Sequence, residues 1–128
     1  MSWQTTRLPA RPDVVAPDGS DVRVLLGLDR GGMAHFELAA GATSIAVVHH
    51  TVEEIWFVAD GTGELWRADD GGEEEVVALE PGVCATIPVG ARFQFRATGE
   101  RPLQILGVTM PPWPGEHEAV AVDGRWTP

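Results

Sequence analysis

The feature that most restricts the fold of this chain is a series of short apolar runs separated at close, regular intervals by turn-forming residues. From Asp21 onward, runs rich in Val, Ile, Leu, Phe and Trp are separated by clusters of Gly, Pro and Asp. This pattern predicts nine β-strands, at residues 22–28, 33–38, 44–49, 55–59, 64–68, 74–79, 83–87, 93–97 and 103–108. No run has the period of an amphipathic helix. The sequence therefore predicts an all-β fold.

The breaks between these runs have the composition of tight hairpin turns. Residues 29–32, 60–61, 69–72 and 98–99 all contain Gly, three of them also contain Asp, and such residues tolerate the positive φ that these turns require. Antiparallel pairing of sequential strands follows. Many short strands leave unpaired edges, and closing them into a two-sheet jelly roll removes most of these edges. We therefore expect a β-barrel over residues 21–110, with its interior as the site.

The chain has 128 residues, which is the size of one domain. Residues 1–20 contain three prolines and are expected to form an irregular N-terminal segment. Residues 111–128 are rich in Pro and Trp, and we expect them to pack on the barrel or on a partner subunit. A homodimer is the expected assembly, because closed two-fold symmetry is the commonest form of oligomer.

The charge and the cysteine content exclude several classes of partner. The formal net charge is −10, with 19 acidic against nine basic residues, so the surface repels phosphate backbones and anionic lipids. We expect neither nucleic acid nor a membrane as a partner. The lone Cys84 excludes an internal disulfide and a cysteine-based zinc cluster, and we expect it to be a small buried apolar residue. Without a basic and apolar leader, a cytoplasmic location is expected.

Two blocks in the middle of the chain resemble the paired motifs of the cupin superfamily. The first motif runs Gly, five residues, His-x-His, three or four residues, Glu, six residues, Gly. Glu54 stands six residues before Gly61 as this pattern requires, and His49 and His50 both fall near its second histidine. The first histidine of the pattern is replaced by valine in either alignment, at position 47 or 48.

The second motif runs Gly, five residues, Pro-x-Gly, two residues, His, three residues, Asn. Gly82, Pro88 and Gly90 fit it without a gap, but Phe93 replaces the histidine and Ala97 replaces the asparagine. The resemblance therefore implies a single-domain cupin β-barrel, which is a double-stranded β-helix of the jelly-roll type, with degenerate metal-binding motifs.

Cupins that bind a metal use three histidines and one glutamate to hold Fe, Mn, Ni, Cu or Zn. Only Glu54 and one of the histidines remain here, fewer than the three protein donors of a catalytic site, so no tightly bound metal is expected. If a divalent transition metal does bind, its ligands are expected to be His49, His50 and Glu54. Adjacent residues of a strand face opposite sides, and we favour His49 as the inward one. Compensating ligands remain open, namely His35, Gln94 and His117.

The loss of the histidine at position 93 makes that part of the interior apolar, which predicts an aromatic pocket for a small organic ligand. The residues expected in or near this pocket are His35, His50, Trp56, Trp66, Phe93, Phe95 and Arg96. The alternative is that the aromatic side chains fill the core, because a small barrel can be packed solid. Arg92 and Arg96 are candidates for holding an anionic group at the barrel mouth, or for ordinary surface ion pairs with Glu.

Three functions are compatible with these residues, and whether the protein is an enzyme is left open. The first is a cupin that binds a small organic ligand in the barrel interior without a tightly bound metal. The second is a metal-independent enzyme similar to the isomerases and epimerases of the superfamily, with His49 and Glu54 as catalytic base and acid. Burial of Glu54 against aromatic residues would raise its pKa toward neutrality. The third is a metal-dependent oxygenase or isomerase with an atypical ligand set.

Overall fold

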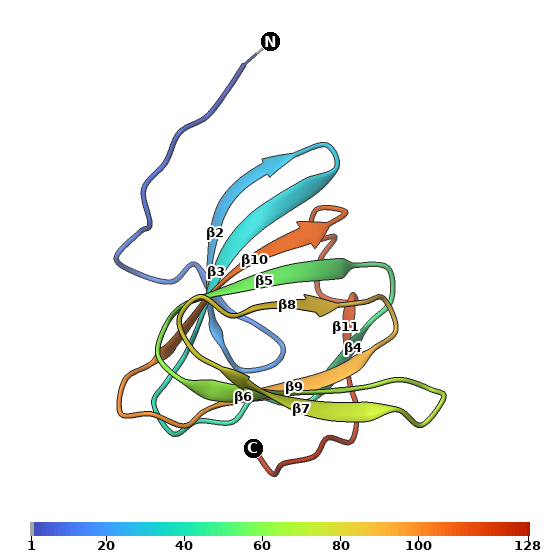
Figure 1. Ribbon diagram of the computed structural model, residues 1–128. Coiled ribbons are helices and arrows are strands. Elements are labelled where there is room, and N and C mark those ends of the chain that lie inside the picture. The colour runs from blue at the N-terminus through green and yellow to red at the C-terminus, as the bar shows by residue number, and fades with distance from the viewer. Residues whose placement is uncertain (1) are drawn as a thin grey trace.

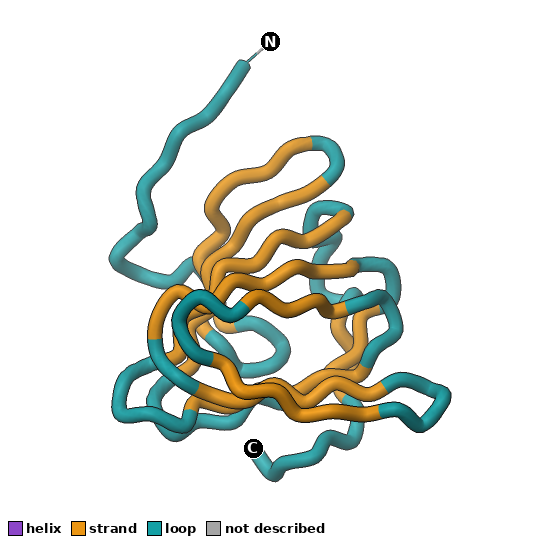
Figure 2. Tube along the Cα trace, in the orientation of Figure 1, coloured by secondary structure: helices purple, strands orange, loops and turns teal. Residues whose placement is uncertain are grey.

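Eleven strands within residues 2–128, the part of the chain that the structure describes, form two antiparallel sheets in a computed structural model (Figure 1). The six-stranded sheet has the order β1 (Val14–Val15), β2 (Asp21–Leu28), β3 (Gly31–Leu38), β10 (Leu103–Met110), β5 (Glu53–Asp60), β8 (Cys84–Ile87). The five-stranded sheet has the order β11 (Ala119–Ala121), β4 (Val47–His49), β9 (Arg92–Ala97), β6 (Gly63–Ala68), β7 (Glu74–Leu79). The two sheets face each other and loops join them at the ends of the barrel (Figure 2).

All nine predicted strands are present, which confirms the all-β barrel. The strand predicted at 44–49 is shorter, because regular pairing begins only at Val47, after an isolated bridge from Thr43 to Arg96. Two short strands were not predicted. β1 lies in the N-terminal segment and β11 in the C-terminal segment, so neither end is wholly irregular. Met1, the first residue of the predicted N-terminal segment, lies outside the described residues.

The core lies between the sheets and follows the two-residue period of the strands. Along β5 the buried residues Glu54, Trp56 and Val58 alternate with exposed ones. Gly107 on the central strand β10 faces the same interior, and a Cβ at this position would overlap the ring of Phe36 on β3. The glycine therefore lets an aromatic ring lie directly across the central strand.

The N-terminal segment is attached to the outer face of the six-stranded sheet through Arg23. Its guanidinium donates to the backbone oxygens of Pro9 (2.8 Å) and Ala10 (3.1 Å), and it lies 3.4 Å from His35 Nδ1. The other ring nitrogen of His35 is 2.9 Å from Gln104 Oε1. The prediction that His35 lines the barrel interior is therefore wrong, because the inward positions of β3 are those of Phe36 and Leu38.

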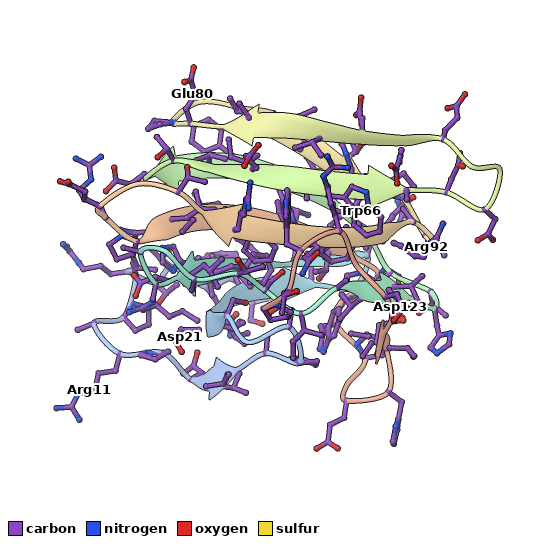
Figure 3. All side chains as sticks on the ribbon, turned by 90° about the horizontal axis from the view of Figure 1, so that it is seen from below. Arg11, Asp21, Trp66, Glu80, Arg92 and Asp123 are labelled. Carbon is purple, nitrogen blue, oxygen red and sulfur yellow. The ribbon has the colours of Figure 1, made fainter. Side chains whose placement is uncertain are left out.

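The C-terminal segment covers the outer face of the five-stranded sheet, where it forms a second apolar cluster. The side-chain amide of Gln94 is completely buried there, donating to the backbone oxygen of Trp126 (2.8 Å) and accepting from its N–H (2.8 Å). Trp66 packs in this cluster with Trp126, and Figure 3 shows it on the sheet side that faces the C-terminal segment. The guanidinium of Arg96 lies 4.3 Å from the centre of the Trp126 ring.

Trp66 and Arg96 are thus outside the barrel, contrary to the prediction that they line its pocket. Arg96 also pairs with Glu64 at 2.6 Å, as the surface ion-pair alternative predicts.

Cys84 is exposed, contrary to the expectation that it is buried. Side chains alternate between the two faces of β8, and Ala85 and Ile87 are the inward ones, so Cys84 points outward. Within residues 2–128 no helix is long and apolar enough to cross a membrane.

Candidate functional site

His49 and Glu54 form a polar pair at one end of the barrel interior. His49 ends β4 in one sheet and Glu54 lies at the start of β5 in the other, so the short connection between these strands brings the two side chains together. His49 Nδ1 lies 3.5 Å from Glu54 Oε2, and both side chains are only 4% exposed. Among the described residues, Nδ1 has no hydrogen-bond partner. The pair is therefore in contact and retains an unused polar atom.

Three aromatic side chains contact this pair. The His49 ring makes edge-to-face contacts with Phe93 and with Trp113, each at 5.1 Å between ring centres. Trp56 donates its indole N–H to Glu54 Oε1 over 3.4 Å. An acid and an imidazole thus lie in an apolar environment, in which an unpaired charge is costly.

This environment shifts the pKa values of Glu54 and His49 in the directions that favour their uncharged forms. Burial raises the pKa of Glu54 to about 7, the indole N–H of Trp56 opposes this, and the charge of Asp18 adds to it. Burial lowers the pKa of His49 below its ordinary value, against the opposing effect of Glu118. At neutral pH the histidine is therefore neutral, and about half of the Glu54 carboxyl groups carry a proton.

Replacement of Glu54 by Gln is expected to stabilise the protein in a pH-dependent way. A carboxyl group whose pKa is raised in the folded state makes the protein less stable as pH increases from the unfolded-state pKa of 4.5 to the folded-state pKa of about 7. The advantage of Glu54→Gln over wild type should therefore be small near pH 4.5 and largest above pH 7. Each pKa unit corresponds to about 1.4 kcal/mol, so the gain approaches about 3 kcal/mol at most. Urea unfolding across this pH range measures it.

The matched control is Glu53→Gln, because Glu53 is the adjacent carboxylate and is exposed. The lowered pKa of His49 has the opposite pH dependence, because it reduces the stability of the protein as pH falls below 6.5. All three proteins contain His49, so this contribution cancels when they are compared. A Glu54→Gln advantage that does not change with pH would contradict the raised pKa.

The residues around the pair do not fit the metal that the cupin motifs imply. Val47 and Phe93 are directly paired across β4 and β9 and both face the interior beside His49, at the places of the missing histidines. His50 is exposed and points away from the barrel, so it is not a third ligand. Throughout residues 2–128 no three His, Cys, Asp or Glu side chains are grouped as metal ligands. Two donors are fewer than a catalytic metal site uses.

The remaining predicted ligands and pocket residues lie apart from the pair. His35 and Gln94 are on outer faces of the sheets, and His117 is exposed on the C-terminal segment. Trp56, Phe93 and Phe95 are in the interior, but Trp56 packs on Phe93 and Phe95 with ring centres 5.8 and 5.2 Å apart, and all three are buried. These aromatic residues fill the barrel as the core alternative predicts.

The sequence did not single out Trp113 and Glu118, which hold the C-terminal segment over the pair. The carboxylate of Glu118 accepts hydrogen bonds from the backbone N–H groups of His50 (2.8 Å) and Thr51 (2.9 Å) and from the Thr51 hydroxyl. Burial opposes ionisation of Glu118, but these bonds outweigh it and lower its pKa. The only signal for this role in the sequence was a tryptophan within a proline-rich tail.

Two surface hollows lie near this end of the barrel without reaching the pair. One, of about 270 Å³, lies between residues 50–51 and residues 114–118. The other, of about 550 Å³, lies beside the β6–β7 hairpin, and Arg67 and Pro88 contribute to its wall. Neither is lined by His49 or Glu54, which are covered by Trp113 and by the connection after β4.

Comparison with known proteins agrees with this architecture. Over 86 residues the chain is 32% identical to the xanthan biosynthesis protein XanB of Xanthomonas campestris pv. campestris, a match that covers 67% of this chain but only 17% of that protein. The capsular polysaccharide assembling protein CapF of Staphylococcus aureus superposes with a TM-score of 0.73, at 17% identity, covering 94% of this chain and 35% of CapF.

Shorter proteins superpose over most of their length. KdgF of Halomonas sp. has a TM-score of 0.65 at 19% identity, over 77% of this chain and 85% of KdgF. A conserved protein of Klebsiella pneumoniae with a double-stranded β-helix domain has a TM-score of 0.67 at 19% identity, over 89% and 90%. At these identities the structures show the fold alone. The family model for the cupin domain matches residues 34–109, and the chain therefore belongs to the cupin family.

Proposed function

We propose that this cupin binds a small hydroxylated organic molecule of the carbohydrate class at His49 and Glu54, without a tightly bound metal. The observation that carries the proposal is a buried acid–imidazole pair with an unpaired nitrogen, in which the imidazole is neutral and about half of the carboxyl groups are protonated at neutral pH. A protonated carboxyl group donates and accepts hydrogen bonds, and neutral imidazole offers an acceptor. Such a pair suits hydroxyl and carbonyl groups better than it suits a charged ligand.

The carbohydrate class is supported by two comparisons and by the aromatic surroundings. XanB is named for xanthan biosynthesis and CapF for the assembly of capsular polysaccharide. The apolar face of a sugar ring packs well against aromatic side chains, and Trp113 offers such a surface next to His49. Because the interior is filled by core side chains, the proposed ligand position is the barrel mouth rather than the space between the sheets.

Access to the pair requires Trp113 to leave His49. Trp113 lies between two prolines, outside the strands, and is 41% exposed, so its movement does not disrupt either sheet. A ligand ring then replaces the edge-to-face contact between Trp113 and His49.

A metal-independent isomerase or epimerase is the second candidate function. The specific observation in its favour is the pKa of about 7 for Glu54 beside His49, because general acid–base catalysis is most effective when the pKa lies near the working pH. One group removes a proton from a carbon next to a carbonyl, and the other returns a proton at a neighbouring atom or on the opposite face. This reaction has no net change in atoms or electrons.

Saturation-transfer NMR with a panel of monosaccharides, uronic acids and sugar phosphates tests the binding proposal. Wild type is expected to bind at least one class, and Glu54→Leu, which has no hydrogen-bonding group, is expected to lose that binding or weaken it at least about tenfold, the effect of losing one hydrogen bond to a charged or strongly polar partner. Glu53→Leu should bind like wild type, because the Glu53 side chain is exposed. Equal binding by Glu54→Leu and wild type would mean that the ligand binds elsewhere.

Solvent exchange in D2O separates the binder from the isomerase. If the pair is catalytic, a bound ligand should take up deuterium next to its carbonyl carbon, and Glu54→Gln should slow this by roughly 10²–10⁴-fold. Binding without exchange would support the binding function and not the isomerase.

Elemental analysis of protein purified without chelator is expected to show no stoichiometric metal. Near-stoichiometric metal that is lost in His49→Ala would overturn the metal-free proposal.

A further inference from the structure

A third polar residue, Thr109, lies on the inner face of the six-stranded sheet beside Glu54. It belongs to β10, the strand between β3 and β5 (Figure 1), and it is directly paired with Glu54 of β5. Thr109 is buried on the same face of β10 as the core residues Leu103 and Ile105. Side chains of directly opposite residues share one face, with Cβ atoms about 4.5–5.5 Å apart. The Thr109 hydroxyl and the Glu54 carboxyl therefore lie side by side in the interior.

On the other side of Thr109 the inner face of the sheet is bare, because the partner of Thr109 on β3 is Gly32. A Cβ added at Gly32 would lie 3.6 Å from Thr109 Oγ1, 3.6 Å from the backbone oxygen of Leu26 and 4.0 Å from Pro112 Cα. These are ordinary contact distances, so a methyl-sized space is open between these atoms, and we call it the Gly32 notch. Gly32 does not have a positive φ, so the backbone itself does not require glycine there.

The Gly32 notch has the same cover as the His49–Glu54 pair. Pro112 borders the notch, and the next residue, Trp113, packs edge-to-face on the His49 ring at 5.1 Å between ring centres. Both residues belong to the segment between β10 and β11, outside the strands. The movement of Trp113 that gives access to the pair therefore also uncovers the notch.

The two polar groups on the sheet match a particular arrangement of ligand hydroxyls. A threonine hydroxyl donates and accepts hydrogen bonds, and a carboxyl group that is partly protonated does the same. Glu54 and Thr109 are neighbours on one face, so they suit two hydroxyl groups on neighbouring carbon atoms of a ring. The Gly32 notch beside Thr109 leaves room for the edge of that ring.

We propose that Thr109 is a specificity-determining residue of the binding site, whose hydroxyl binds one of two neighbouring hydroxyl groups of a sugar ring while Glu54 binds the other. The inference rests on the proposed function and narrows its ligands to rings with vicinal hydroxyl groups. Gly32 contributes by the absence of a side chain, because the ring edge occupies the notch next to Thr109 Oγ1.

Saturation-transfer NMR titrations with D-glucose, D-mannose and D-galactose test the role of the hydroxyl. Thr109→Val keeps the β-branched shape and should bind these hexoses about three- to tenfold more weakly than wild type, the effect of one neutral hydrogen bond. Thr109→Ser keeps the hydroxyl and should bind like wild type. Thr86→Val is the matched control, because Thr86 is exposed on β8. Circular dichroism confirms that each variant is folded.

The outcomes separate this inference from the proposed function. Wild-type affinity in Thr109→Val, with binding lost in Glu54→Leu, would overturn the role of Thr109 and leave the proposed function in place. Equal losses in Thr109→Val and Thr109→Ser would also overturn it, because the hydroxyl would then not be the group that matters. Wild-type binding by Glu54→Leu, or no binding of any of the three hexoses by wild type, would overturn the inference together with its premise.

Monodeoxy sugars give a readout that a purely structural role of Thr109 would not change. One of the 2-, 3- and 4-deoxy analogues of the bound hexose lacks the hydroxyl group that Thr109 binds. This analogue should bind wild type and Thr109→Val equally, because neither complex contains the hydrogen bond. If every analogue binds Thr109→Val more weakly than wild type by the same factor, Thr109 does not contact the sugar hydroxyls.

Filling the Gly32 notch should also weaken binding. Gly32→Ala adds a methyl group at ordinary contact distances, so the protein should fold, but the hexoses should bind at least about tenfold more weakly because the ring edge and the methyl group compete for one space. Gly27→Ala is the control, because Gly27 is paired with Gly32 in the same row but is exposed on β2. Unchanged binding by Gly32→Ala would show that the ring edge does not occupy the notch.

Discussion

A Val47→His/Phe93→His variant is expected to bind about one divalent transition ion per chain, whereas wild type binds none stoichiometrically. Val47 and Phe93 are cross-strand partners that face the interior beside His49, and His49 already contacts Glu54. The two substitutions raise the number of converging donors from two to four, which is the number in a complete tetrahedral site. His is larger than Val at position 47 and smaller than Phe at position 93. The two volume changes partly offset each other, so the core should tolerate them.

The measurement is elemental analysis after incubation with zinc, iron or manganese and gel filtration. Val47→His/Phe95→His is the matched control, because Phe95 is also interior but lies two residues farther along β9 and packs against Leu65 instead. It should retain less ion than the first variant, because only three donors, from position 47, His49 and Glu54, converge in it instead of four. Failure of the first variant to bind, while folded, would mean that the positions at the barrel mouth do not converge as described.

Trp56→Ala is expected to lower the free energy of unfolding by about 3–5 kcal/mol, the usual cost of removing a large buried aromatic side chain. Trp56 lies at the centre of the interior and contacts Phe36, Phe93 and Phe95 at ring separations of 5.2–6.1 Å. Domains of this size have a total stability of about 5–15 kcal/mol, so the loss is a large fraction of the whole.

Urea unfolding followed by far-UV circular dichroism measures this loss. Trp3→Ala is the control, because Trp3 is 83% exposed and its removal should change stability by less than about 0.5 kcal/mol. A small effect of Trp56→Ala would indicate that the interior is a hydrated pocket rather than a packed core. The experiment therefore checks in solution that these aromatic residues form a packed core.

The strands were predictable because they depend on local patterns. Alternating β-branched and aromatic residues between glycine-rich turns indicate strands whatever their partners are. β1 and β11 were not predictable in this way. Each is only two or three residues long, and each forms because an edge, β2 or β4, offers unpaired backbone groups to a passing segment.

The candidate site was predictable only in part. Strand parity and the cupin motif indicated His49 and Glu54, and the structure places the two in contact. Side chains alternate between the two faces of a strand, but this alternation does not show which face is the barrel interior when both faces are covered. Trp66, His35 and Gln94 are all buried, but beneath the terminal segments rather than between the sheets.

The sequence by itself determined the class of fold, the turns, and the pair of motifs with their missing histidines, because these depend on residue type and spacing along the chain. Only the tertiary structure decided that Val47 and Phe93 stand opposite each other beside His49, that Trp113 covers the pair, and that Glu118 holds this cover in place. These contacts join segments more than 40 residues apart. Their geometry depends on how the two sheets close, and no local pattern encodes that closure.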